Sequence, residues 1–229
     1  MIKTAVCFLV FLFFSGASYA QDAAQTISKL TAKMNLVKDY SVNAKIKSDI
    51  PLIKILTVNA TIYFKQKDKF RIISKGIAIL PKQGFTDVSK LLKQKDSYTA
   101  IVTGNEKIGN ATAQILTILP VSDTTDLILA KLWIDLANDM VLKSQITTRN
   151  NGTLTADYKY GMQKEFGLPD SIVFTVDVKK FKIPKGVATD INKTSNRDAN
   201  KPEPKTGKIY IKLSDYVVNK GIKDEVFVK

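Results

Sequence analysis

Apolar and polar residues alternate along most of this chain, and this pattern restricts the possible fold more than any other feature. From residue 56 to 64 every second residue is apolar, and Thr57, Asn59 and Thr61 stand between them. Successive side chains of a strand point to opposite faces of a sheet, so the spacing predicts strands with one buried face. The same alternation returns at Leu132/Ile134, Leu142/Ile146, Leu154/Ala156/Tyr158, Ile172/Phe174/Val176/Val178 and Ile209/Ile211/Leu213.

Turn residues separate several of these runs. Asn151 and Gly152 form the strongest short-range hairpin signal, because both tolerate positive φ. The segments 136–139 and 167–170 are two further predicted turns. Together the runs and turns predict a long antiparallel meander of ten or eleven strands.

Two segments have helical spacing instead. From 21 to 38 apolar residues recur every three or four positions, which predicts an amphipathic helix whose stripe covers an apolar surface. A second, shorter helix is predicted over 86–94, with Val88, Leu91 and Leu92 as its stripe. The stripe of the first helix either docks permanently or acts as a movable lid, and it consists of Ile27, Leu30, Met34 and Val37.

The first twenty residues have the pattern of a secretory signal. Lys3 precedes an apolar run over 5–14, and small residues lead to Ala20. We expect cleavage after Ala20 and a periplasmic location. The chain's one cysteine, Cys7, leaves with the signal, and Gln21 stands where a lipid-anchored protein would need a cysteine.

About 209 residues remain after cleavage, enough for one large β domain over 21–229. From 184 to 207 the chain is rich in Lys, Asn, Asp and Pro, which predicts an exposed loop. A final strand and tail are expected over 208–229.

The composition argues against several kinds of site. The chain has no histidine, which removes Ser-His-Asp triads and the commonest zinc and iron sites. Asp135, Asp157 and Asp177 are scattered on polar faces without a diagnostic spacing, so we expect no enzyme, no catalytic residue, no metal and no cofactor.

The mature chain is basic, with a net charge of about +13 once Lys3 is removed. Its lysines are spread through strands and loops, and no nucleic-acid motif is present. The charge therefore fits either an anionic membrane surface as partner or a solvated, lysine-rich surface.

A meander of this length must close or curl, and an amphipathic helix can cover its open side. A curled sheet can enclose an apolar cavity, although a filled core would be built from the same residues. Moving a 16-carbon acyl chain out of water is worth roughly 12 kcal/mol. A shallow groove cannot shield that much apolar surface, so a carrier needs a deep apolar cavity. The candidate cavity residues are Leu56, Val58, Ile62, Phe64, Leu132, Ile134, Leu142, Ile146, Phe174 and Val176.

Four sequence segments resemble a known family. The first is Thr61–Phe70, and the second is the pair of Leu132–Asp135, which contains a Trp-x-Asp, and Leu142–Lys143. The third is the turn at Asn151–Gly152, and the fourth is Phe181–Asp190, which contains a Phe-x-x-Pro-x-Gly-Val. In this order they resemble segments of the LolA/LolB lipoprotein carriers.

This resemblance spans about residues 40 to 190 and implies an incomplete, strongly curved antiparallel barrel with helices as a lid. It further implies uptake of lipoprotein acyl chains from a release complex at the inner membrane and delivery to an outer-membrane acceptor. Without an anchoring cysteine the chain is more similar to the soluble LolA type than to the LolB type.

One position departs from that pattern. LolA-type carriers commonly have an arginine at the position of Gln66, implicated in holding the lid to the barrel. Glutamine can donate hydrogen bonds to lid carbonyls, but without charge-assisted strength. Arg71 on the next strand is an alternative latch.

Two functions follow from these observations. The first is a monomeric periplasmic carrier for acyl chains of lipids or lipoproteins. The second is a non-catalytic interaction or structural module of the envelope, with a filled core.

Overall fold

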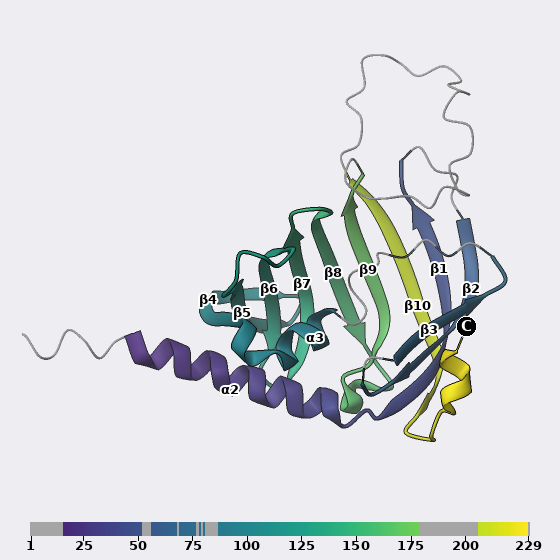
Figure 1. Cartoon of the computed structure of the whole chain (residues 1–229), viewed down its shortest axis with the longest axis horizontal. Helices are drawn as coiled ribbons and strands as arrows, with labels where there is room; N and C mark the ends of the chain where they lie inside the picture. The colour runs from purple at the N-terminus through teal and green to yellow at the C-terminus, as the bar shows by residue number, and fades with distance from the viewer. Residues whose placement is uncertain are drawn as a thin grey trace, which may run out of the picture.

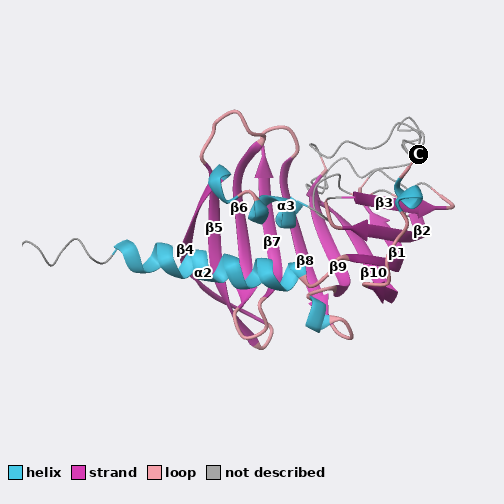
Figure 2. Ribbon diagram, turned by 60° about the horizontal axis from the view of Figure 1, so that its bottom comes forward, coloured by secondary structure: helices cyan, strands magenta, loops and turns pink. Residues whose placement is uncertain are grey.

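The computed structural model of the chain describes residues 16–51, 56–67, 69–76, 78, 80, 87–178 and 206–228. Within them, ten strands form one antiparallel sheet, and two α-helices cover part of it (Figures 1 and 2). The strands are β1 (Asp39–Asp49), β2 (Leu56–Lys65), β3 (Lys69–Ser74), β4 (Tyr98–Ile108), β5 (Ala111–Pro120), β6 (Leu127–Asp135), β7 (Met140–Thr148), β8 (Gly152–Tyr160), β9 (Pro169–Asp177) and β10 (Thr206–Val218). The helices are α2 (Gly16–Asn35) and α3 (Asp87–Lys93), with short 3₁₀ turns η2 (Lys95–Ser97), η3 (Lys164–Phe166) and η4 (Asp224–Phe227).

The sheet is strongly curved and not closed. Its strand order is β3-β2-β1-β10-β9-β8-β7-β6-β5-β4, so β3 and β4 are its two edges. Figure 1 shows the strands turning around a concave side that α2 partly covers. The predicted mainly β fold, an incomplete antiparallel barrel, is confirmed.

The topology is not a simple meander. Strands β4 to β9 follow one another, but β10 lies between β9 and β1 and joins the N-terminal strands to the rest. The predicted final strand starts at 208, whereas β10 begins at Thr206. Alternation along β10 directs Ile209, Ile211 and Leu213 inward.

The predicted turns are confirmed. Gly152 begins β8 with φ 70° after a three-residue loop, and its partner in the hairpin is Thr148. Gly167 has φ 65° and ends η3 before β9. Both positions need the left-handed backbone that glycine adopts without steric cost.

A first core cluster fills the concave side of one half of the sheet. Its members come from β1, β2, β8, β9 and β10, where alternate residues are buried. They pack side chain to side chain across neighbouring strands. The largest buried members are Phe174, Ile46, Ile62, Ile209, Ile211 and Val42.

A second cluster lies between the helices and the other half of the sheet. α2 packs on β4 and on α3, and Figure 2 shows α2 crossing the strands of this half. The helix contributes Ala23, Ile27 and Leu30, and α3 contributes Val88 and Leu92. The sheet contributes Tyr98, Leu116, Ile118, Ala130, Leu132, Ile134, Val141 and Ile146.

The first helix ends earlier than its predicted boundary at 38. It stops at Asn35, and Val37 follows it as a buried residue of the connection to β1. Among the α2 side chains that the structure describes, Asp22, Thr26 and Lys33, all after the expected cleavage site, make hydrogen bonds to the sheet or to its β6–β7 turn. Figure 1 shows the N-terminal part of α2 extending past the edge of the sheet.

Several predicted features fall outside the described residues. These are residues 1–15 of the expected signal, the Phe181–Asp190 segment, and the expected loop as far as residue 205. Among the helices that are described, none combines the length and the apolarity needed to cross a membrane.

The C-terminal end folds back on β2 and β3. Asp224 pairs with Lys65 at 2.7 Å and with Lys69 at 2.9 Å. Arg71 donates hydrogen bonds to the carbonyls of Val226 and Val228. Arg71 therefore holds the C-terminal segment, and its suggested role as an alternative latch stays a prediction.

The first cluster predicts a large effect of one substitution. Phe174 is 0% exposed, so Phe174→Ala should lower the free energy of unfolding by about 3–5 kcal/mol, because it leaves a cavity. Leu119, 43% exposed, is the control, and Leu119→Ala should stay within about 0.5 kcal/mol. Urea denaturation measures both, and equal effects would contradict this description of the core.

The C-terminal contacts predict a local response to acid. Hydrogen bonds from Lys65 and then Lys69 lower the pKa of Asp224 from 3.8 to about 2. Because the folded pKa is depressed, the contact is fully present above pH 3.8 and is lost as the pH falls toward 2. The protection factors of the Val226 and Val228 amides, which are corrected for the intrinsic pH dependence of exchange, should fall over that range, while the exposed pair leaves overall stability almost unchanged.

The control for this experiment is Asp224→Asn. In that variant the same amides should have low protection factors at all pH values. Protection factors of these amides that stay constant in the unmodified protein between pH 4 and pH 2 would contradict the role of Asp224.

Candidate functional site

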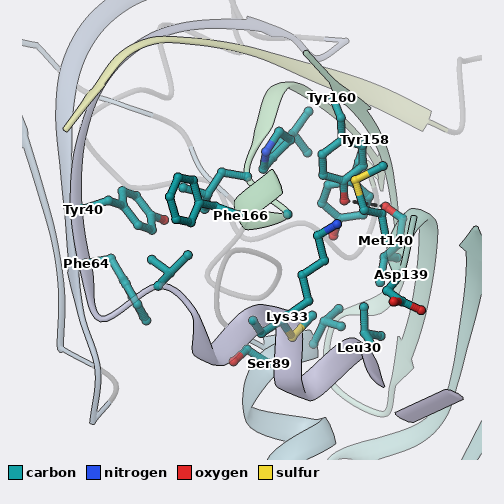
Figure 3. A pocket seen from close by; sticks show the side chains of 18 of the residues that line it. Leu30, Lys33, Tyr40, Phe64, Ser89, Asp139, Met140, Tyr158, Tyr160 and Phe166 are labelled. Carbon is teal, nitrogen blue, oxygen red and sulfur yellow. Dashed lines mark hydrogen bonds between the residues drawn. The ribbon is translucent and has the colours of Figure 1, made fainter. Parts of the chain in front are cut away.

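An apolar pocket of about 150 Å³ lies where the two core clusters meet. Its walls come from the C-terminal half of α2, α3, the start of β1, the end of β2, β10, and the β6–β7 and β8–β9 connections with the strands beside them (Figure 3). Tyr158 packs against both clusters and marks their boundary. The apolar and aromatic wall includes Leu30, Met34, Val37, Tyr40, Phe64, Met140, Val141, Tyr158, Phe166, Leu168, Ile172, Leu213 and Tyr216.

The C-terminal end of α2 is tied to the sheet beside this pocket. Gln66 donates from Nε2 to the carbonyls of Asn35 at 3.2 Å and Val37 at 3.1 Å. Asn219 donates from Nδ2 to the Leu36 carbonyl at 2.8 Å, and its Oδ1 accepts from the Lys38 N–H at 2.7 Å. The last carbonyls of a helix lack partners within it, so these two side chains supply what the helix end needs.

Asn219 can do this because its backbone is left-handed, with φ 57°. Asparagine is among the few residues that tolerate this conformation. Its N–H also donates to the Asp39 carbonyl at 2.9 Å. The connection from α2 to β1 is therefore held from both β2 and the end of β10.

The body of α2 is held by polar contacts at two further places. Gln114 on β5 is 5% exposed; it accepts from Thr26 at 2.9 Å and donates to Asp22 at 3.0 Å. Lys33 donates to the Asn138 carbonyl in the β6–β7 turn at 2.6 Å.

The β6–β7 turn that receives Lys33 is shaped by Asp135. Its carboxylate accepts from the Ala137 N–H at 3.0 Å and from Asn138 Nδ2 at 2.7 Å. The aspartate of the Trp-x-Asp segment thus orders the carbonyl that Lys33 contacts. Trp133 lies on the opposite face, where it donates to Glu106 and has Lys143 over its ring.

Four tyrosines give the pocket a partly polar lining. Tyr160 donates to the Val141 carbonyl, Tyr216 donates to the Pro169 carbonyl, and Tyr158 shares a hydrogen bond with Ser144. Tyr40 stacks on Phe64 at 5.2 Å, and its labelled side chain points into the pocket in Figure 3. Burial raises the pKa of Tyr40, Tyr160 and Tyr216, so these phenols stay neutral.

The residues predicted for the lid lie at or near the pocket. Leu30, Met34 and Val37 line it, whereas Ile27 packs in the second cluster. Gln66, at the predicted latch position, makes the two hydrogen bonds described above. Whether α2 moves as a lid stays a prediction.

Most residues predicted for the cavity lie elsewhere on the same concave face. Phe64 lines the pocket, but Ile62, Phe174 and Val176 pack in the first cluster. Val58 is half-buried, and the side chain of Leu56 is outside the described part. Leu132, Ile134 and Ile146 pack in the second cluster.

Leu142 is displaced by a β-bulge. Trp133 pairs with Lys143 and Ile134 pairs with Val141, so Leu142 is an extra residue between them. The bulge reverses the alternation, and Val141 takes the inward position that Leu142 would have had. Leu142 is half-buried and is not a member of either cluster.

Acidic side chains do not gather into a reaction centre in the described ranges. Asp135 orders its turn, Asp157 is exposed on β8, and Asp177 ends β9. The described residues also contain no group of three or more His, Cys, Asp or Glu arranged to hold a metal ion.

Sequence reasoning missed the tyrosines, Gln114 and Asn219. Tyr40 is in phase with the buried residues of β1, so extending the alternation backward would have found it. Gln114 is in phase with Leu116 and Ile118, and a polar residue at an inward position is a usable signal. For Asn219 the sequence has no comparable signal.

The helix end predicts the effect of changing Gln66. Gln66→Ala removes two hydrogen bonds, each worth about 0.5–1.5 kcal/mol, so the last turn of α2 should exchange its amide hydrogens faster. Gln66→Arg should restore protection, because a charged donor strengthens such bonds. Unchanged exchange in Gln66→Ala would contradict the assigned contact.

Comparisons with known proteins agree with this architecture. The sequence model of the MucB/RseB N-terminal domain matches residues 55–156, less than half of the chain. No curated protein matches the sequence. A domain assigned to outer membrane lipoprotein sorting, from Vibrio parahaemolyticus, is 10% identical with a TM-score of 0.61, covering 91% of this chain and 97% of that one.

Two other solved structures are similar. A LolA superfamily protein from Nitrosomonas europaea is 12% identical with a TM-score of 0.58, and a DUF1329 family protein from Desulfovibrio piger is 12% identical with a TM-score of 0.57. Each match covers 90% of this chain and 97% of the other. At such identities the likeness concerns the fold, and the chain accordingly has the LolA-like fold that its sequence segments resemble.

Proposed function

We propose that the protein is a non-catalytic periplasmic carrier that binds acyl chains of lipids or lipoproteins and moves them from the inner to the outer membrane. The observation that carries the proposal is the apolar pocket between the end of α2 and the middle of the sheet. The LolA-like fold and the expected export signal support it. An inner-membrane release complex and an outer-membrane acceptor are the partners that the resemblance implies.

The pocket as it stands accepts only a short apolar group. A cavity of about 150 Å³ accommodates a ligand of roughly benzene size. A full acyl chain therefore requires α2 to move away from the sheet. The clamp at Gln66 and Asn219 leaves its C-terminal end fixed, and the contacts that must break are those of Gln114 and Lys33.

Approximate energies indicate that an acyl chain can replace the body of α2 on the apolar wall. Three hydrogen bonds hold the body of α2, one between neutral groups worth about 0.5–1.5 kcal/mol and two with a charged partner worth about 1.5–3 kcal/mol each. Each of Ile27 and Leu30 adds about 1.5–3 kcal/mol on burial. An acyl chain offers about 0.8 kcal/mol per methylene. A chain of 12 to 16 carbons is therefore comparable to the helix as an occupant of the apolar wall.

A second function is favoured by a specific observation. Six residues predicted to line the cavity, Ile62, Leu132, Ile134, Ile146, Phe174 and Val176, are packed in filled clusters. A filled concave side suits an envelope interaction module that binds a protein. Extraction of purified protein separates the two functions, because a carrier should retain lipid and an interaction module should not.

Blocking the pocket tests the carrier function directly. Met34→Trp adds volume inside the pocket, so its affinity for a fluorescent fatty acid should fall at least about tenfold, equivalent to about 1.4 kcal/mol. Leu36, 54% exposed and two residues away, provides the control. Leu36→Trp should bind as tightly as the unmodified protein, and equal binding by both variants would contradict the assigned site.

A further inference from the structure

One cation lies in the wall of the apolar pocket. Among the described residues that line it, Lys33 is the one basic residue and Asp139 the one acidic residue. Figure 3 shows Lys33 extending from α2 toward Tyr158 and Met140. Its methylenes run past Gly167, where an added Cβ would lie 3.6 Å from Cε.

The charge of Lys33 has no counter-ion within the described ranges. The two ion pairs found there both involve Asp224, and neither includes Lys33. Figure 3 shows the carboxylate of Asp139 directed away from the ammonium group. Among the residues that the structure describes, the Lys33 ammonium donates one hydrogen bond, the 2.6 Å bond to the neutral Asn138 carbonyl.

An ammonium group has three donors, so the Asn138 bond leaves two of them available. The turn that supplies the Asn138 carbonyl is fixed by Asp135, which keeps Lys33 directed along the pocket wall. A ligand anion can therefore bind Lys33 beside this carbonyl in the present pocket, or take the place of the carbonyl when the body of α2 moves. Such a bond would be charge-assisted and stronger than one between neutral groups.

We infer that the pocket selects acyl chains with a negatively charged oxygen head, such as the carboxylate of a fatty acid or the phosphate of a single-chain phospholipid. The head accepts hydrogen bonds from Lys33, and the chain lies along Met34, Phe64 and Leu213. This inference rests on the proposed carrier function and adds the ligand class. Neutral and cationic chains of the same length should bind more weakly.

A competition experiment tests the selection by charge. The uncharged probe 1-aminoanthracene is bound to the full mature chain at pH 8 and displaced with decanoate, decyl phosphate, decan-1-ol or decylammonium. One or both anions should displace it at concentrations at least about tenfold below decan-1-ol, and decylammonium should be weakest. The two anions distinguish carboxylate from phosphate recognition.

Three variants assign the effect to Lys33. Lys33→Met keeps the apolar stem, and its preference for anions over decan-1-ol should shrink to about twofold or less. Lys33→Arg keeps the charge and should keep the preference. Lys29 is exposed on the same helix, and Lys29→Met should behave like the unmodified protein. Thermal unfolding of each variant checks that it is folded.

The outcomes separate this inference from the carrier function. If all four compounds displace the probe equally, or if Lys33→Met keeps the preference, the role of Lys33 is overturned and the carrier function stands. If none of the compounds displaces the probe, both are overturned. If the preference for anions disappears in Lys33→Met but persists in Lys33→Arg and Lys29→Met, the result supports both the role of Lys33 and the carrier function.

Discussion

The concave face of a sheet that does not close must be covered by something else. Strands β4 to β7 are covered by α2 and α3, which complete the second cluster, and the strands from β8 to β2 fill their side with their own large residues. α2 ends at Asn35, just before the chain enters β1. The pocket lies between the end of α2 and the first cluster, where neither the helices nor the large side chains of that cluster fill the concave face.

The contacts of α2 differ in kind along its length. At its end, Gln66 and Asn219 satisfy backbone groups that would otherwise lack partners, and this makes the connection to β1 a fixed point. Along its body, the helix depends on an apolar stripe and on side chains, Thr26 and Lys33, that can find water or a ligand instead. Such an element can exchange its place with an apolar chain while the rest of the sheet stays folded.

Much of this fold follows from the sequence, because alternation, helical spacing and turn residues each act locally. Such local patterns predict the strand that contains Ile62, the helix stripe with Ile27 and Leu30, and the turn at Gly152. The site is harder to predict, because alternation gives the face of a residue but not whether that part of the face is filled. Phe64 and Phe174 share the concave face, yet only Phe64 reaches the pocket, and the bulge at Leu142 arises from pairing that no local pattern encodes.

The most direct test of the central claim uses the methionine methyl groups. Met34 and Met140 line the pocket, whereas Met162 is 87% exposed in the β8–β9 connection. In protein labelled with ¹³C at these methyl groups, titration with decanoate should shift the NMR signals of Met34 and Met140 and leave that of Met162 in place. Binding that leaves Met34 and Met140 unchanged would contradict the account, because the acyl chain would then lie outside the pocket.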